Sequence, residues 1–111
     1  MRLFLFSGLA TIAFITAAHA DGPMSAAELK KLAPGTYHVA VATVSMDVNL
    51  ATNGKISGAT SKGDKDQGRW RIVGDRICVT FKRWLDHKEK CDRLSQAGTE
   101  IKGGAFSAWK R

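Results

Sequence analysis

The sequence has few of the residues on which common active sites depend. Its 111 residues include three histidines, two cysteines and one tyrosine. It contains no Gly-rich phosphate loop, strained nucleophile turn or paired-histidine metal motif. His38 and His87 have no partner at a characteristic spacing, although a Ser-His-Asp triad depends on geometry rather than spacing. We therefore predict a non-enzymatic protein without metal or cofactor, and a hydrolase is the least supported class.

Long hydrophobic runs are also scarce, and the one that stands out lies at the start of the chain. Arg2 precedes an apolar run from Leu3 to Ala18, which ends in the small-x-small sequence Ala18-His19-Ala20. This pattern predicts a secretory signal peptide over residues 1–20, cleaved after Ala20. The run is shorter than the roughly 20 apolar residues of a membrane span, which disfavours the alternative of a retained anchor. We expect a soluble periplasmic or secreted domain over residues 21–111, without a transmembrane or lipid anchor.

The two cysteines, Cys78 and Cys91, are expected to form a disulfide. Export to an oxidising compartment makes pairing the default for such a chain. Closing a loop of this size contributes about 3 kcal/mol in the chain-entropy model, which matters for a small core. A zinc site would need clustered histidines, and a redox pair would need a closer spacing.

The stretch from Gly68 to Cys91 predicts a β-hairpin. Apolar and polar residues alternate on both sides of Gly74-Asp75, and a two-residue connection that begins with glycine favours a primed turn. The resulting register places Val73 opposite Arg76, Ile72 opposite Ile77, Arg71 opposite Cys78, Trp70 opposite Val79 and Arg69 opposite Thr80. The inner face should then hold the structural core residues Trp70, Ile72, Ile77, Val79 and Phe81. A slip of one residue would turn Trp70 outward.

Before the hairpin, the sequence predicts one helix and several strands. Ser25 and Glu28 match a capping box, so a short helix should run from about Ala26 to Leu32 and end before Pro34-Gly35. The β-rich stretch Thr36–Leu50 changes phase near Ala42-Thr43. We interpret this change as a β-bulge or sharp bend, with a break into two strands as the alternative.

The remaining segments predict further short strands separated by turns. Asn53-Gly54 marks a turn, Lys55–Thr60 a strand and Ser61–Gln67 a solvated polar loop, in which Asp64-x-Asp66 is a poor match to a calcium loop. Strands are expected at 91–95, 99–102 and 105–109, with turns at 96–98 and 103–104. The fold class is mainly β: an antiparallel meander of seven or eight strands curled into a small barrel or sandwich, with one short N-terminal helix.

The charge is strongly positive, and it concentrates near the hairpin. The formal net charge is +7, and loss of Arg2 with the signal peptide leaves +6. We expect a candidate anion-binding face on the outside of the hairpin beside the disulfide, formed by Arg69, Arg71, Arg76, Lys82 and Trp84. Its partners would be anionic lipid, acidic polysaccharide or an acidic protein, since export argues against nucleic acid. Solubility alone is the competing explanation for the charge.

A series of short motifs runs along nearly the whole mature chain: Ala27-Glu28-Leu29 at the helix start, Pro34-Gly35-Thr36-Tyr37, Gly68-x-Trp70, the Gly74-Asp75 turn and Cys78-x-x-Phe81-x-x-Trp84 before Cys91. In these motifs the chain resembles a family of small exported alphaproteobacterial proteins of unknown function. Phe81 stands where that family commonly has tryptophan. The resemblance implies a periplasmic location and a β-rich fold, and it supplies no catalytic residues.

The sequence thus favours a non-enzymatic periplasmic binding or interaction module with a basic face for anionic envelope components. The alternative is a secreted inhibitor of a hydrolase, similar to lysozyme inhibitors in architecture only. A positive charge argues against the cationic lysozyme itself as the target. A curled sheet of this size could also enclose a small apolar ligand, and the sequence does not distinguish a filled core from a cavity.

Overall fold

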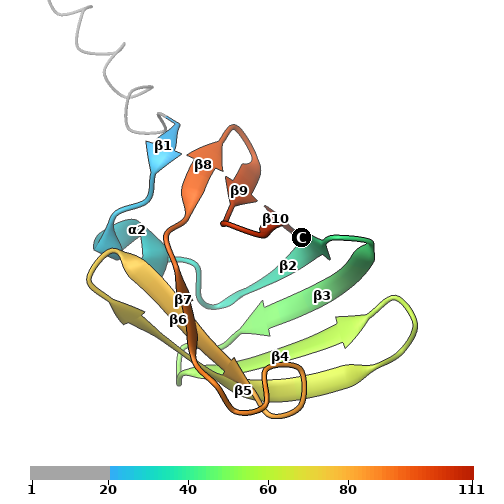
Figure 1. Cartoon of the computed structure of the whole chain (residues 1–111). Helices are drawn as coiled ribbons and strands as arrows, with labels where there is room; N and C mark the ends of the chain where they lie inside the picture. The colour runs from blue at the N-terminus through green and yellow to red at the C-terminus, as the bar shows by residue number, and fades with distance from the viewer. Residues whose placement is uncertain (1–20) are drawn as a thin grey trace, which may run out of the picture.

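Within residues 21–111, ten strands form one curled antiparallel sheet, accompanied by one short helix (Figure 1). The structure is a computed structural model and describes residues 21–111, so the predicted signal peptide lies outside the described residues. The strands are β1 (Gly22–Pro23), β2 (Gly35–Val41), β3 (Val44–Leu50), β4 (Lys55–Thr60), β5 (Lys65–Val73), β6 (Arg76–Phe81), β7 (Lys90–Asp92), β8 (Ser95–Ala97), β9 (Glu100–Lys102) and β10 (Phe106–Lys110). The helix is α2 (Ala26–Lys30).

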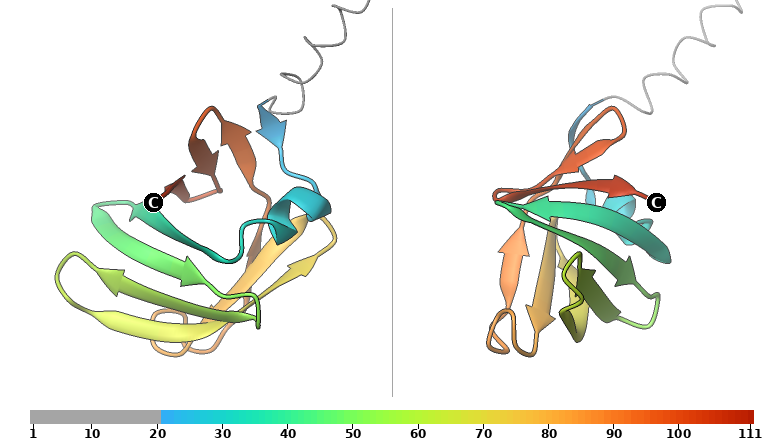
Figure 2. Two further views of the ribbon diagram at one scale, coloured as in Figure 1. Left: turned by 180° about the vertical axis from the view of Figure 1, so that it is seen from behind. Right: turned by 90° about the vertical axis from the view of Figure 1, so that its right-hand side faces the viewer.

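The sheet curls into a half-barrel that does not close by strand pairing. Its order is β1-β8-β9-β10-β2-β3-β4-β5-β6-β7, so β1 and β7 are the two edges of the described sheet. The views in Figure 2 show the strands wrapping around an interior, with α2 beside the central hairpin. The predicted fold class is confirmed, although the number of strands is ten rather than seven or eight.

The central hairpin has the predicted register at every pair. Ile72 lies opposite Ile77 and Trp70 opposite Val79, and Gly74 has the positive φ of 63° that the tight turn requires. Ile77 and Phe81 are buried, and Trp70, Ile72 and Val79 are partly buried against the core. The Trp70 indole Nε1 donates a hydrogen bond of 2.8 Å to the carbonyl oxygen of Ala51. The predicted inner face is therefore the concave face of the sheet.

Gly68 explains how β5 passes so close to β6. A Cβ atom built on Gly68 would lie 1.7 Å from the carbonyl oxygen of Thr80, a distance that only a backbone shift could relieve. A glycine inside a strand often marks such a close backbone approach. The Gly68-x-Trp70 motif thus combines a residue that admits the neighbouring strand with one that fills the core.

The phase change in Thr36–Leu50 is a hairpin turn, so our preferred interpretation as a bulge or bend is wrong. Val41 pairs with Val44, and Ala42-Thr43 is a two-residue turn between β2 and β3. The alternative of two strands is the one observed. Ala42 has a φ of 53°, the left-handed conformation that such a turn requires at its first position. Glycine usually occupies this position in a two-residue turn, so the sequence with alanine there did not predict one.

Several predicted boundaries also need correction. The polar loop ends earlier than expected, because Lys65–Gln67 begin β5. The predicted strand at 91–95 is shortened to β7, and residues 95–97 form strand β8 instead of contributing to a turn. In the last hairpin Ser107 pairs with Lys102, so four residues connect the paired positions rather than two. These segments are rich in polar residues, so the sequence predicted loops and turns, but exposed strands also tolerate polar residues.

The helix closes one end of the half-barrel. Its capping box is present: Glu28 N–H donates to Ser25 Oγ at 3.2 Å, and Ser25 N–H donates to Glu28 Oε1 at 2.9 Å. Leu29 is fully buried, and the Tyr37 hydroxyl donates to the carbonyl oxygen of Leu32 at 2.6 Å. Residues 21–111 include no helix with the length and apolar character needed to cross a membrane.

Candidate ligand-binding cavity

The concave face of the sheet encloses an apolar cavity of about 540 Å³. Because side chains alternate between the two faces of each strand, β2, β3, β4 and β6 all direct apolar residues inward. The walls include Val39, Val41, Met46, Val48 and Phe106. The volume lies within the roughly 300–1,000 Å³ typical of small-molecule sites. The sequence is compatible with a filled or a hollow interior, and the structure shows a hollow.

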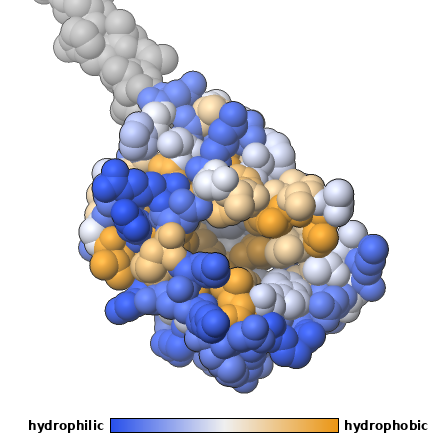
Figure 3. All heavy atoms as spheres, viewed as in Figure 1, coloured by the Kyte–Doolittle hydropathy of each residue, from blue (hydrophilic) through white to orange (hydrophobic). Residues whose placement is uncertain are grey.

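The two ends of the half-barrel differ in how completely they are packed. At the closed end, apolar side chains from α2 and the flanking loops are at most 8% exposed: Met24, Leu29, Leu32 and Leu94. At the open end, far from the helix along the strands, the cavity-lining side chains are only partly buried: Val41, Met46, Leu85 and Phe106. Figure 3 shows the hollow, with apolar walls and a polar rim. A ligand would enter where the protein leaves its own apolar surface uncovered.

The edge strand β7 contributes two charged residues to the cavity wall. Lys90 is paired with Val79 and Asp92 with Ile77, and both partners point inward. Residues paired across antiparallel strands lie on the same face of the sheet, so both charged side chains lie on the concave side. The strand predicted at 91–95 did not include Lys90. Lys90 and Asp92 flank Cys91, which faces outward. Strand alternation could therefore have predicted that both charged residues face inward.

A hydrogen bond joins β7 to the loop between β9 and β10, two segments that do not pair as strands. The Asp92 carboxylate accepts a hydrogen bond from Gly104 N–H at 2.6 Å. Gly103 allows the close approach, because a Cβ there would lie 2.3 Å from the Phe106 ring and 2.8 Å from Asp92 Oδ2. This contact holds Asp92 against the opposite wall and fixes one side of the cavity.

Trp84 lies on the concave side, so its predicted place on the outer face is wrong. Its ring lies over Gly58, where a Cβ would approach the ring to 2.7 Å, and its centroid is 4.9 Å from that of Phe81. The chain turns after β6, which ends the strand alternation on which the prediction depended. Trp84 therefore lines the cavity and packs against the core instead of joining the basic outer face.

Asp66 holds the turn that carries Trp84. Its Oδ2 accepts hydrogen bonds from the backbone N–H groups of Arg83 at 2.8 Å and Trp84 at 2.9 Å, and Oδ1 accepts one from Gln67 N–H. Burial by itself raises the pKa of Asp66, but these N–H donors and the Arg83 charge outweigh it and hold the pKa below its usual value. The ionised carboxylate thus anchors the open end of the cavity.

Asp64 supports the same turn from outside. Its carboxylate accepts hydrogen bonds of 2.9 Å from the Trp84 indole Nε1 and from the Arg83 guanidinium, and these two donors lower its pKa, the indole most. The predicted solvated turn is therefore an organised anchor. The oxygens that the poor calcium-loop match would have offered to a cation instead accept N–H donors.

The four cations of the predicted outer face are exposed, but they are not equally free. Arg71 forms a two-pronged ion pair with Glu89, with both N–O distances 2.8 Å, and this pairing raises the pKa of Arg71 and lowers that of Glu89. Within residues 21–111, Arg69, Arg76 and Lys82 form no side-chain ion pair. The basic face is thus reduced to three free cations.

Lys82 borders a second hollow, on the convex side of the sheet. This groove measures about 600 Å³ and is lined by polar residues such as Asn49, Ser57 and Gln67. These side chains are exposed, and the Asn49 amide donates to Thr36 Oγ1 at 2.9 Å. The groove is more open than the concave cavity and offers less apolar surface, so the concave cavity is the stronger binding site.

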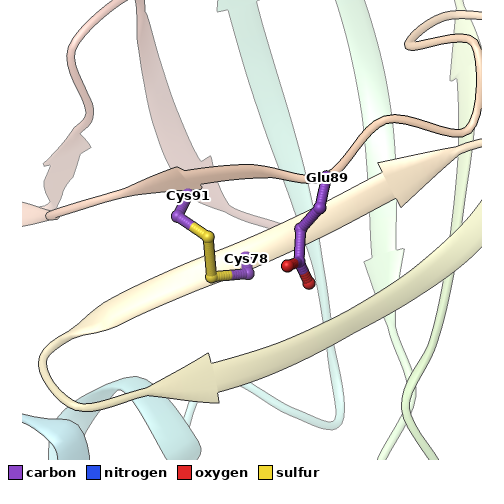
Figure 4. A group of neighbouring side chains, drawn as sticks. All are labelled: Cys78, Glu89 and Cys91. Atoms are coloured by element: carbon purple, nitrogen blue, oxygen red, sulfur yellow. A yellow bond between two sulfur atoms is a disulfide. The ribbon is translucent and has the colours of Figure 1, made fainter.

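The disulfide lies on the convex side, beside a carboxylate (Figure 4). Cys78 and Cys91 are joined by an S–S bond of 2.03 Å, as predicted, and with Glu89 they form a group of three potential metal ligands. Metal binding requires thiolates, which the disulfide removes, and Glu89 is paired with Arg71. This cluster therefore fastens β7 to β6 instead of offering a metal site.

Comparisons of the chain with protein-family models, with curated proteins and with solved structures found no match.

Proposed function

We propose that this protein is a non-enzymatic binding module of the cell envelope, whose curled sheet takes up the apolar part of a lipid-like envelope component. The observation that carries this proposal is the open apolar cavity of about 540 Å³ on the concave face. An exposed apolar surface of this kind is costly in water, so a protein that keeps one generally uses it for binding. The signal-peptide prediction and the positive charge support an envelope location and an anionic partner.

The energetics favour a chain-like ligand. Each methylene transferred from water into an apolar site gains about 0.8 kcal/mol, so burial of about ten methylenes supplies roughly 8 kcal/mol before the entropic cost of association. The half-buried walls at Val41, Met46 and Phe106 would lose their remaining exposure in the same step. The basic convex face, with Arg69, Arg76 and Lys82, would add long-range attraction to an anionic membrane or polysaccharide surface.

Filling the cavity tests this proposal. Val48→Trp places a large ring on the concave face, and Asn49→Trp places the same ring on the convex face one residue later. The protein without residues 1–20 is titrated with N-phenylnaphthylamine, an uncharged dye whose fluorescence rises in apolar sites. We expect saturable dye binding by the wild type and Asn49→Trp, and at least tenfold weaker binding by Val48→Trp. Equal binding by the two variants, or no binding by the wild type, would contradict the proposal.

A further inference from the structure

Lys90 gives the apolar cavity a cation at its wall. It is paired with Val79 on the concave face, and its side chain is exposed, so the ammonium group is accessible from the solvent side. Lys90 takes part in none of the ion pairs found within residues 21–111. A lysine in this position has its charged end beside a surface that is otherwise apolar.

The two carboxylates nearest to Lys90 in sequence are both engaged elsewhere. Glu89 points to the convex side and is held by Arg71 through two contacts of 2.8 Å. Asp92 shares the concave face with Lys90, and its Oδ2 accepts the 2.6 Å hydrogen bond from Gly104 N–H. Asp92 keeps its negative charge in this contact, but within residues 21–111 it forms no ion pair with Lys90, so the ammonium group of Lys90 remains available to an external anion.

The disulfide fixes the backbone that carries this lysine. Cys91 follows Lys90 directly and is bonded to Cys78 of the adjacent strand, so a three-residue edge strand is held in register. The Asp92–Gly104 contact holds the other side of Lys90. A site whose supporting backbone is fixed loses less entropy when a ligand binds.

We propose that the ligand is a single-chain anionic amphiphile, whose chain lies in the cavity and whose carboxylate or phosphate head pairs with Lys90. This inference rests on the proposed function, since it names the class of ligand that the cavity takes. One unpaired cation at the wall matches one anionic head, and the cavity volume matches one ligand of drug size. An ion pair at the edge of an apolar site is a charge-assisted contact that an uncharged head cannot form.

The test compares ligands that share a chain and differ in head group. Dodecanoate, dodecyl phosphate, dodecanol and dodecyltrimethylammonium are used, each below its micelle concentration, to displace N-phenylnaphthylamine from the protein. We expect an anionic compound to displace the dye at concentrations about tenfold lower than dodecanol, and the trimethylammonium compound to be the weakest. Stronger displacement by dodecanoate assigns a carboxylate head, and stronger displacement by dodecyl phosphate assigns a phosphate head.

Charge reversal at Lys90 and at nearby Lys88 distinguishes a specific anion-binding site from a general electrostatic attraction to the protein. Lys90→Glu and Lys88→Glu change the net charge equally, but Lys88 lies outside the cavity wall. We expect Lys90→Glu to lower the affinity for the anionic compounds at least tenfold and to leave the affinity for dodecanol unchanged. Lys90→Met should abolish the preference for an anionic head group. Lys88→Glu should change the affinity for each compound less than twofold. Unchanged dye binding shows that the variants retain the cavity.

Two results would overturn this inference while leaving the proposed function in place. One is equal displacement by dodecanol and by the anionic compounds in the wild type. The other is an equal loss of anion affinity in Lys88→Glu and Lys90→Glu. Failure of the dye and of every dodecyl compound to bind would instead overturn the proposed function itself.

Discussion

The closed and open ends of the half-barrel use the same kind of side chain for different purposes. At the closed end, α2 and Leu94 cover the sheet, and Leu29 has no exposed surface. At the open end, Met46 and Phe106 are equally apolar but remain partly exposed around the cavity. Burial of apolar surface stabilises the folded state only where that surface leaves water. The closed end should therefore contribute most of the stability, whereas the open end carries the cavity of the proposed binding site.

Truncating one apolar side chain at each end should separate these two roles most strongly. Leu29→Ala removes a fully buried side chain and should lower the free energy of unfolding by about 3 kcal/mol. Met46→Ala removes a side chain that already borders a hollow, so the loss should be less than about 1 kcal/mol, with weaker binding of the dye. Urea denaturation of both variants measures the difference. Similar losses of stability at the two sites would contradict the assignment.

Acid should loosen the open end through Asp66 and Asp64. Both have lowered pKa values in the folded protein, so their stabilising contribution is complete above the unfolded pKa near 4 and is lost as the pH falls through the folded pKa. The free energy of unfolding should thus decrease below about pH 4. Asp66→Asn should make this decrease shallower in urea denaturation at a series of pH values. Asp86→Asn, in the nearby loop, serves as the control, and an equally large effect there would contradict the role of Asp66.

The smallest expected effect concerns the turns, which also differ between the ends. The turn at Gly74 places glycine at a φ of 63°, whereas the turn at Ala42 places alanine at 53°. The left-handed conformation costs a residue with a Cβ about 1 kcal/mol. Ala42→Gly should therefore stabilise the protein by up to about 1 kcal/mol, and Gly74→Ala should destabilise it by a similar amount. Thermal denaturation of both variants checks the opposite signs, and a destabilised Ala42→Gly variant would show that Ala42 is not strained.

The hairpin around Trp70 shows how far local sequence patterns carry. Its register followed from two observations, the strict alternation of apolar and polar residues and the two-residue turn at Gly74-Asp75, which require the same pairing. The disulfide partners followed from the presence of just two cysteines in a chain predicted to be exported. The turn at Ala42-Thr43 lacked the usual glycine, so the phase change in the sequence did not by itself select between a bulge and a new strand.

The candidate site was less accessible to prediction than the fold. Arg69, Arg71 and Arg76 lie outside as expected, but the sequence did not show that Glu89, 18 residues from Arg71, would pair with it. Trp84 was misplaced because strand alternation stops at Phe81, and because the carboxylate of Asp66 in the neighbouring strand β5 holds the turn that follows β6. Contacts between residues far apart in the chain carry no periodic signal.

By itself, the sequence determined the β-rich class, the central hairpin with its register, the capping box of the helix and the disulfide. Each of these depends on interactions between near neighbours or on a count of cysteines. Only the tertiary structure decided that the sheet stops short of closure, that its concave face holds a cavity, and that Lys90 lines this cavity on the concave side. The same alternating pattern is compatible with a filled core or with a hollow one. Which of the two forms depends on how strongly the sheet curls and on what covers its ends.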